Sequence, residues 1–222
     1  MQRLVVPDHF NRNTRRVHAI GPERTGLVLL QLACEVLGVA DLSACDVLDV
    51  GCGVRFAQTI INRDVPIRSY TGIDVDEPLI RFLQAEVHDP RFTFARWDIH
   101  NPLYNPQAPR MTRESSLPVE GDFDVIWLFS VFTHLPPDDA DALLAIMRRH
   151  LRRDGRLLFS AFLDPMVATF EEKAPDSPGL RSTYNEGFLR SLVERNGWQV
   201  LAVHDKDPEN KFIQHHFVCV AT

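Results

Sequence analysis

The chain has 222 residues, of which 45% are hydrophobic and 24% are charged, as in an ordinary globular protein with a buried core. Its formal net charge of -6 argues against a protein that coats nucleic acid or an anionic membrane. No apolar run reaches the length of about 18 residues that a membrane-spanning helix needs. We therefore expect neither a nucleic acid nor a membrane as a partner.

The cysteines indicate a reducing compartment. None of Cys34, Cys45, Cys52 and Cys219 stands in a CxxC pair or in a Cys/His array with zinc spacing. The first residues are polar and rich in arginine, unlike a secretion signal. We expect reduced thiols, a cytoplasmic protein and no bound metal.

Strands and helices are predicted to alternate along the first half of the chain. Residues 1–22 form a polar N-terminal arm, and helix-like and strand-like periodicities follow it. The predicted elements are a helix over 23–37, a strand over 46–50, a helix over 54–62, a strand over 67–73, a helix over 78–88 and a strand over 91–97. This alternation is typical of a parallel sheet covered by helices.

The second half continues the alternation and then ends differently. Its predicted elements are a connection over 101–121, strands over 123–129 and 156–162, a helix over 138–151, a connection over 164–183, a helix over 185–196 and strands over 199–204 and 212–220. No helix separates the last two strands, so we expect an antiparallel hairpin with its turn at 205–211. The chain is therefore predicted to be one α/β domain over 1–222, a three-layer Rossmann-like sandwich. Its sheet would be mostly parallel and seven-stranded, with one antiparallel strand near the C-terminus.

The most informative stretch is a glycine turn after the first strand, Asp49-Val50-Gly51-Cys52-Gly53. Glycines remove side-chain bulk and permit dihedral angles closed to other residues, so the backbone can approach a ligand closely. Asp74 follows the next strand about twenty residues further on, where a carboxylate can accept hydrogen bonds from both ribose hydroxyls. Together they predict a pocket for an adenosine-containing cofactor. The alternatives are that Asp49 only pins the turn and that Asp74 only caps the next helix.

Two further segments are expected at the same edge of the sheet. Asp98 can accept from an adenine amino group while the backbone N–H of Ile99 serves a ring nitrogen, or Asp98 can form an Asx turn. Phe129 and Ser130 follow the fourth strand, and their backbone is expected to line the pocket. His134 is the best-placed candidate for a general base, with a structural contact to the backbone as the alternative.

In this order, the motifs resemble those of the class I S-adenosylmethionine-dependent methyltransferases from about Glu23 to the C-terminus. The segments that carry the resemblance are the glycine turn, Gly72-Ile73-Asp74-Val75-Asp76, Arg96-Trp97-Asp98-Ile99 and residues 123–135. The resemblance implies that Cys52 and Val75 also contact the cofactor. It implies S-adenosylmethionine as methyl donor, S-adenosylhomocysteine as product, and an acceptor site built by the arm and the two connections.

The resemblance does not name the methyl acceptor, and one position of the glycine turn departs from the family's pattern. We expect the methyl group to go to an O or N atom of a small-molecule acceptor, since the arm and the two connections carry mixed charge and no long basic patch. The protein could also form a homodimer. Family members commonly have a further glycine where this chain reads Gly53-Val54-Arg55-Phe56. We expect Arg55 to be an exposed helix residue, with a contact to the cofactor carboxylate as the alternative.

Two other functions stay open at this point. Phe56 stands where the nicotinamide fingerprint GxGxxG needs its third glycine, so a nicotinamide-dependent oxidoreductase is the weaker alternative. The altered turn also fits a protein that binds S-adenosylmethionine or S-adenosylhomocysteine without transferring a methyl group.

Overall fold

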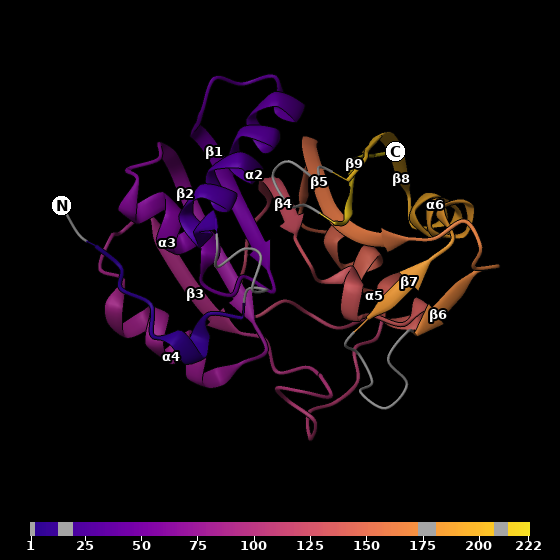
Figure 1. Cartoon of the computed structure of the whole chain (residues 1–222), viewed down its shortest axis with the longest axis horizontal. Coiled ribbons are helices and arrows are strands. Elements are labelled where there is room, and N and C mark those ends of the chain that lie inside the picture. The colour runs from indigo at the N-terminus through magenta and orange to yellow at the C-terminus, as the bar shows by residue number, and fades with distance from the viewer. Residues whose placement is uncertain (1–2, 13–19, 173–180, 207–212) are drawn as a thin grey trace.

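The computed structural model describes residues 3–12, 20–172, 181–206 and 213–222. Within these residues, nine strands form a sheet in the order β3-β2-β1-β4-β5-β7-β6, with β9 beside β5 and β8 beside β9. The strands are β1 (Leu42–Val50), β2 (Ile67–Asp74), β3 (Phe92–Arg96), β4 (Phe123–Leu128), β5 (Leu151–Leu163), β6 (Phe170–Glu172), β7 (Ser182–Tyr184), β8 (Trp198–His204) and β9 (His215–Ala221). The N-terminal strands form one side of the molecule and the C-terminal strands the other (Figure 1).

Helices cover both faces of this sheet. They are η1 (Asp8–Phe10), α2 (Pro22–Leu37), α3 (Arg55–Asn62), α4 (Glu77–Glu86), η2 (Phe132–His134), α5 (Pro137–Arg148) and α6 (Glu186–Arg195). Neighbouring residues of β1 point to opposite faces: Val47 packs into the core beneath α2, α3 and α4, and Leu48 into the core beneath α5 and α6. The three layers that the sequence predicts are therefore confirmed.

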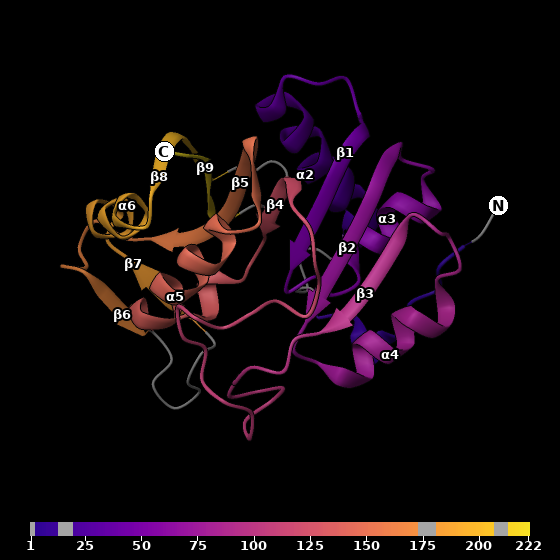
Figure 2. The ribbon, with the colours of Figure 1, turned by 180° about the vertical axis from the view of Figure 1, so that it is seen from behind.

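The mostly parallel sheet with one antiparallel core strand near the C-terminus is also confirmed, but among the described residues the sheet has nine strands and not the predicted seven, because β6 and β7 extend it. Strands β1 to β5 run parallel to one another, which Figure 2 shows from behind for β1, β2 and β3. Strand β9 pairs antiparallel with both β5 and β8. This is the single antiparallel strand of the core and the hairpin that the sequence predicts, although residues 207–211 of its turn lie outside the described residues.

Several boundaries were predicted wrongly. Strand β1 begins at Leu42 and not at residue 46, and β5 begins at Leu151 and not at residue 156. The connection 164–183 contains β6 and β7, because Thr183 and Tyr184 pair with the end of β5 and extend the sheet. Such three-residue strands are too short to show a periodicity in sequence. The predicted helix 138–151 ends at Arg148, because Leu151 already pairs with Phe123 in the sheet. Residues 13–19 of the arm and 173–180 of the connection lie outside the described residues.

Parallel strands place their carboxyl ends at one edge, and this geometry positions the site. The carboxyl ends of β1, β2, β4 and β5 meet there, so segments distant in sequence become neighbours. Among the described residues, no helix is both long and apolar enough to cross a membrane.

Candidate functional site

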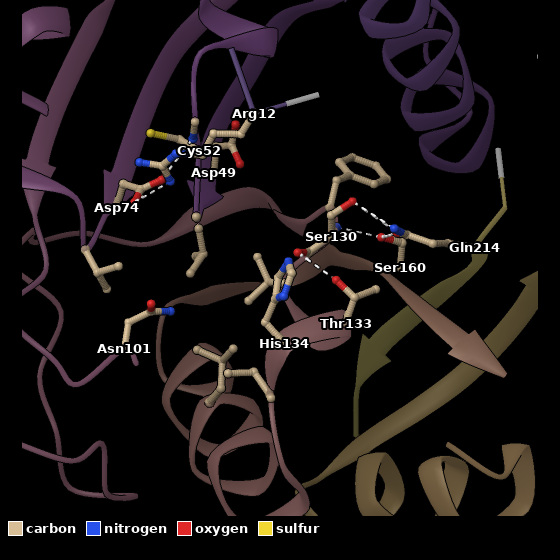
Figure 3. Close-up of a pocket in the computed structure, with 18 of the residues that line it drawn as sticks. Arg12, Asp49, Cys52, Asp74, Asn101, Ser130, Thr133, His134, Ser160 and Gln214 are labelled. Carbon is tan, nitrogen blue, oxygen red and sulfur yellow. Dashed lines mark hydrogen bonds and ion pairs between the residues drawn. The ribbon is translucent and has the colours of Figure 1, made fainter. Parts of the chain in front are cut away.

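A cavity of about 1150 Å³ opens at this edge of the sheet. Figure 3 shows two groups of side chains in it: Arg12, Asp49, Cys52 and Asp74 at one end, and Ser130, Thr133, His134, Ser160 and Gln214 at the other. Of the residues predicted for the site, all except Asp98 line this cavity: Asp49, Gly51, Cys52, Gly53, Asp74, Val75, Ile99, Phe129, Ser130 and His134.

The glycine turn has the conformation that its sequence predicts. Gly51 and Gly53 have φ angles of 68° and 51°, in the left-handed region that favours glycine. The N–H groups of Gly51 and Cys52 donate to the carbonyl of Ile73 at 2.8 and 3.0 Å, which ties the turn to the end of β2. A Cβ atom on Gly51 would lie 2.8 Å from Val131 Cγ2, so a larger residue would disturb the cavity wall.

Asp49 is buried at the base of the turn, with an exposed fraction of 2%. Its Oδ2 accepts a hydrogen bond of 2.5 Å from the Tyr70 hydroxyl. Burial raises the pKa of Asp49 to about 7, against the opposing effects of the Tyr70 hydrogen bond and the nearby Arg55 cation. The carboxyl group is therefore tied to the neighbouring strand β2 and also lines the cavity.

Asp74, at the end of β2, is also buried and directed at the turn. Its Oδ2 accepts from the N–H of Gly53 at 3.1 Å, and its Oδ1 accepts from the N–H of Asp76 at 3.0 Å. Asp76, and not Asp74, is the N-cap of α4, because its Oδ1 accepts from the N–H of Leu79. The helix-cap alternative for Asp74 is therefore excluded, and the carboxylate keeps further acceptor positions toward the cavity.

The predicted adenine segment is arranged differently from the expectation. Asp98 is exposed, forms an ion pair with Arg96 at 3.0 Å and accepts from Asn105 Nδ2 at 3.0 Å. The N–H of Ile99 donates to the carbonyl of Trp97, whereas its side chain lines the cavity. An adenine contact through Asp98 thus stays a prediction.

The expectation that Arg55 is an exposed helix residue was wrong. Arg55 is the first residue of α3 and only partly exposed, and it lines the cavity beside the glycine turn. Burial lowers its pKa, and the Asp49 carboxylate opposes that shift. The missing glycine of the turn therefore places a cation next to a buried acid at the cavity wall.

Ser130 is held in a strained conformation at the end of β4. Its φ angle is 62°, a region that residues with a side chain rarely adopt. Its N–H donates to Ser160 Oγ at 2.7 Å, and its carbonyl accepts from Thr133 Oγ1 at 3.0 Å. Gln214 completes the network, accepting from Ser160 Oγ at 2.5 Å and donating to Ser130 Oγ at 3.0 Å. These hydrogen bonds hold Ser130 in its strained conformation and form a polar surface in the cavity.

Two other polar groups share this end of the cavity. His134 lies in η2, where its N–H donates to the carbonyl of Val131 at 2.9 Å, and its ring is among the cavity residues (Figure 3). Thr183 on β7 is 3% exposed, and its hydroxyl has no hydrogen-bond partner among the described residues. An orphaned buried hydroxyl is costly, so a ligand whose polar group paired with Thr183 would remove that cost.

Sequence reasoning missed several residues of the cavity: Arg12, Ser160, Thr183 and Gln214. Ser160 left a usable signal, because it is a polar residue inside an otherwise apolar strand. Arg12 and Gln214 left none. Among the described residues, no group of three or more His, Cys, Asp or Glu side chains could hold a metal ion.

Comparisons with known proteins agree with this geometry. Residues 48–157 match a family model described as a methyltransferase domain. The glycopeptide N-methyltransferase MtfA complexed with S-adenosylmethionine is similar in structure, with a TM-score of 0.63 and 14% identity over 91% of this chain and 94% of that one. Magnesium protoporphyrin IX methyltransferase (ChlM) from Synechocystis PCC 6803, with bound S-adenosylhomocysteine, has a TM-score of 0.61 and 15% identity over 97% and 92%. An S-adenosylmethionine-dependent methyltransferase from Clostridium acetobutylicum ATCC 824 has a TM-score of 0.61 and 12% identity over 92% and 94%.

The fold and the cavity thus define a Rossmann-like protein with a nucleoside-type site at the carboxyl edge of its sheet. The chain contains a methyltransferase domain and has the fold of the class I S-adenosylmethionine-dependent methyltransferases, so it is an enzyme with S-adenosylmethionine as methyl donor. The residues in place fit this cofactor, because two glycines with positive φ and two buried carboxylates face one end of the cavity. The family match favours this assignment over a nicotinamide-dependent oxidoreductase.

Proposed function

We propose that this enzyme transfers a methyl group to an O or N atom of a small-molecule acceptor. The observation that carries the proposal is the single cavity that joins the glycine turn to the Ser130 network. Its volume of about 1150 Å³ exceeds the range of roughly 300–1000 Å³ that is usual for one small ligand. A cofactor at one end and an acceptor at the other account for that size.

The cofactor end is proposed from the residues around the turn. Gly51 and Gly53 let the backbone approach the ligand, and Asp74 is proposed to accept hydrogen bonds from the ribose hydroxyls. Cys52, Val75 and Ile99 would contribute the apolar walls against the nucleoside, and Phe129 would line the other side. Asp49 and Arg55 carry opposite charges at the cavity wall, which suits the zwitterionic amino-acid part of the cofactor.

The acceptor end is proposed from its polar groups. Ser130, Ser160, Thr183 and Gln214 offer hydroxyl and amide groups in a confined space, with Thr183 Oγ1 still lacking a partner among the described residues. This arrangement is that of a site for a compact polar molecule rather than for a nucleic acid, which needs a dense array of cations. MtfA is a glycopeptide N-methyltransferase and ChlM is a magnesium protoporphyrin IX methyltransferase, so both names point to acceptors other than nucleic acids.

The main contribution of the protein to methyl transfer is to orient the cofactor and the acceptor. The bound cofactor supplies a methyl group on a sulfonium, which is already strongly electrophilic. The cavity walls would align the acceptor atom with that methyl group, and alignment alone accounts for much of the acceleration. His134 is proposed to remove a proton from the acceptor, because its ring lines the acceptor end of the cavity and histidine is the side chain that most often acts as a general base.

The test is a transfer assay with labelled S-adenosylmethionine. The protein would be incubated with pools of metabolites that carry hydroxyl, carboxyl or amine groups, and labelled products identified by mass. We expect transfer to one chemical class and binding of S-adenosylhomocysteine in calorimetry. Tight cofactor binding with no transfer to any pool would contradict the acceptor proposal, and loss of binding at millimolar cofactor would contradict the cofactor site.

A further inference from the structure

The described part of the N-terminal arm is a fixed part of the structure. Leu4 is 2% exposed, its N–H donates to Asn62 Oδ1 at 2.8 Å, and its carbonyl accepts from Asn62 Nδ2 at 3.1 Å. Further along, the ring of Phe10 packs against the ring of Phe82 on α4 with centroids 5.0 Å apart. The arm thus runs across α3 and α4 and reaches the cavity at Arg12.

Arg12 joins three separate segments at the cofactor end of the cavity. Its guanidinium forms an ion pair with Asp76, and its Nη1 lies 3.9 Å from Asp74 Oδ1. The same guanidinium lies over the ring of Tyr104, 3.7 Å from its centroid. Tyr104 belongs to the connection 101–121, so the arm, the end of β2 and that connection meet at one side chain. Figure 3 shows Arg12 directed at Asp74.

The Arg12 cation affects the ionisation of Asp74, because Asp74 is buried and has other titratable groups close to it. Burial raises the pKa of Asp74, and the Arg12 cation is the largest influence that lowers it. Among the described residues, the other charged or titratable groups that interact with Asp74 are Asp49, Cys52 and Tyr70, and Asp76 lies beside it on the same turn. A carboxylate that accepts hydrogen bonds from two ribose hydroxyls has to stay ionised. None of these neighbours is a cation, so none of them stabilises the ionised form of Asp74 as Arg12 does.

We propose that Arg12 is a positioning residue for the cofactor: it fixes the Asp74 and Asp76 carboxylates at the wall where the ribose binds, and its stack on Tyr104 closes that wall. The proposal rests on the placement of the ribose at Asp74 given above. It adds a residue of the N-terminal arm, outside the core motifs, to the cofactor site. A guanidinium suits the role because it is planar, permanently charged and able to stack and pair at once.

The test compares the full-length protein with its Arg12→Ala and Arg12→Lys variants. Dissociation constants for S-adenosylhomocysteine and for 5′-methylthioadenosine, which shares the nucleoside, would be measured by calorimetry at about pH 7.5 and about pH 5.5. We expect Arg12→Ala to weaken both ligands about five- to twentyfold at the higher pH, the usual effect of one charged contact. Because Asp74 would then protonate at a higher pH, the loss should grow as the pH falls.

The lysine variant and a second arginine separate positioning from folding. Arg12→Lys keeps the charge, so it should restore the pH profile while binding both ligands less tightly than the wild type, since the planar stack is lost. Arg3→Ala alters an exposed arginine of the same arm and should change neither affinity nor its pH dependence. Thermal unfolding of each variant would verify that the fold is intact.

The inference and the proposed function fail in different ways. Wild-type protein that binds neither ligand would contradict the cofactor site itself. Wild-type binding together with unchanged affinity and pH profile in a folded Arg12→Ala or Arg12→Lys protein would contradict the role of Arg12 alone. An equal loss at both pH values in Arg12→Ala would also contradict it, because a purely steric change has no reason to follow the ionisation of Asp74.

Discussion

The Tyr70 hydroxyl donates a hydrogen bond of 2.5 Å to Asp49 Oδ2 inside the sheet, and neither side chain is more than 2% exposed. This contact joins the residue at the base of the glycine turn to the middle of the neighbouring strand. A buried carboxyl group with a shifted pKa couples the stability of the folded protein to proton binding. Its effect can therefore be measured as the pH dependence of the free energy of unfolding.

The first prediction concerns the pH dependence of folding in the cofactor-free protein. Burial raises the pKa of Asp49 from its ordinary 3.8 to about 7, so the folded state holds this proton more tightly than the unfolded state. The contribution of Asp49 to stability is therefore fully present below about pH 4 and is lost as the pH rises to about 7. An Asp49→Asn variant should lack this loss, gaining on the wild type by a few kcal/mol in order of magnitude over that window.

Denaturant titrations at several pH values would measure the free energy of unfolding of both proteins. Tyr70→Phe serves as a matched comparison, because removing the hydrogen bond to the carboxylate should steepen the loss. Parallel pH profiles for the wild type and Asp49→Asn would show that Asp49 has an ordinary pKa in the folded protein.

The second prediction concerns the ribose. Asp74→Asn should weaken binding of S-adenosylhomocysteine by about 1–3 kcal/mol, the usual cost of unmaking buried hydrogen bonds to a charged group. Asp122→Asn, at an exposed site elsewhere on the chain, is the control and should bind like the wild type. Calorimetry would give the dissociation constant of each variant for S-adenosylhomocysteine. Unchanged affinity in a folded Asp74→Asn protein would contradict the assignment of Asp74 to the ribose.

The third prediction concerns the amino-acid end of the cofactor. Arg55→Gln removes a cation at the cavity wall, so it should weaken binding of S-adenosylhomocysteine about tenfold, or about 1.4 kcal/mol. Binding of 5′-methylthioadenosine, which has no carboxylate, should stay within twofold or so of the wild type. Arg81→Gln on the exposed face of α4 is the control. Equal losses for both ligands would place Arg55 at the nucleoside or in a purely structural role.

The fourth prediction concerns His134. Its replacement by alanine should leave cofactor affinity nearly intact and slow methyl transfer by about 100- to 10,000-fold, the usual contribution of a general base. Single-turnover assays with the acceptor that the transfer assay reveals would separate the chemical step from binding. A transfer rate equal to that of the wild type at every pH would mean that the acceptor needs no base at this position.

Much of the site could be predicted from sequence because its signals are local. A strand that ends in Asp49 and continues through Gly51 and Gly53 specifies a turn with positive φ wherever it occurs. Asp74 stands at the end of the next strand, and parallel strands bring their carboxyl ends together. The order of strands and helices, the closing hairpin and the cofactor class all followed from patterns of this kind.

Other features depend on residues far apart in the chain. Ser130 meets Gln214, 84 positions away, and Leu4 meets Asn62, 58 positions away, contacts that no periodicity encodes. The same holds for Arg12, which becomes part of the site only because the arm is tied across α3 and α4. Arg55 was misjudged because most surface arginines are simply solvated, whereas here the end of β1 and the start of α3 bury it against Asp49.

The sequence by itself therefore determined the glycine turn and the two acids beside it, since backbone conformation and strand ends are properties of short segments, and the resemblance of its motifs to a methyltransferase family implied the methyl donor. Only the tertiary structure decided which charges face that turn, that Asp98 pairs with Arg96, and that a strained Ser130 lines the other end of the cavity. The physical reason is that packing and desolvation act between segments, so a charge acquires its partner and its pKa only when the chain is folded.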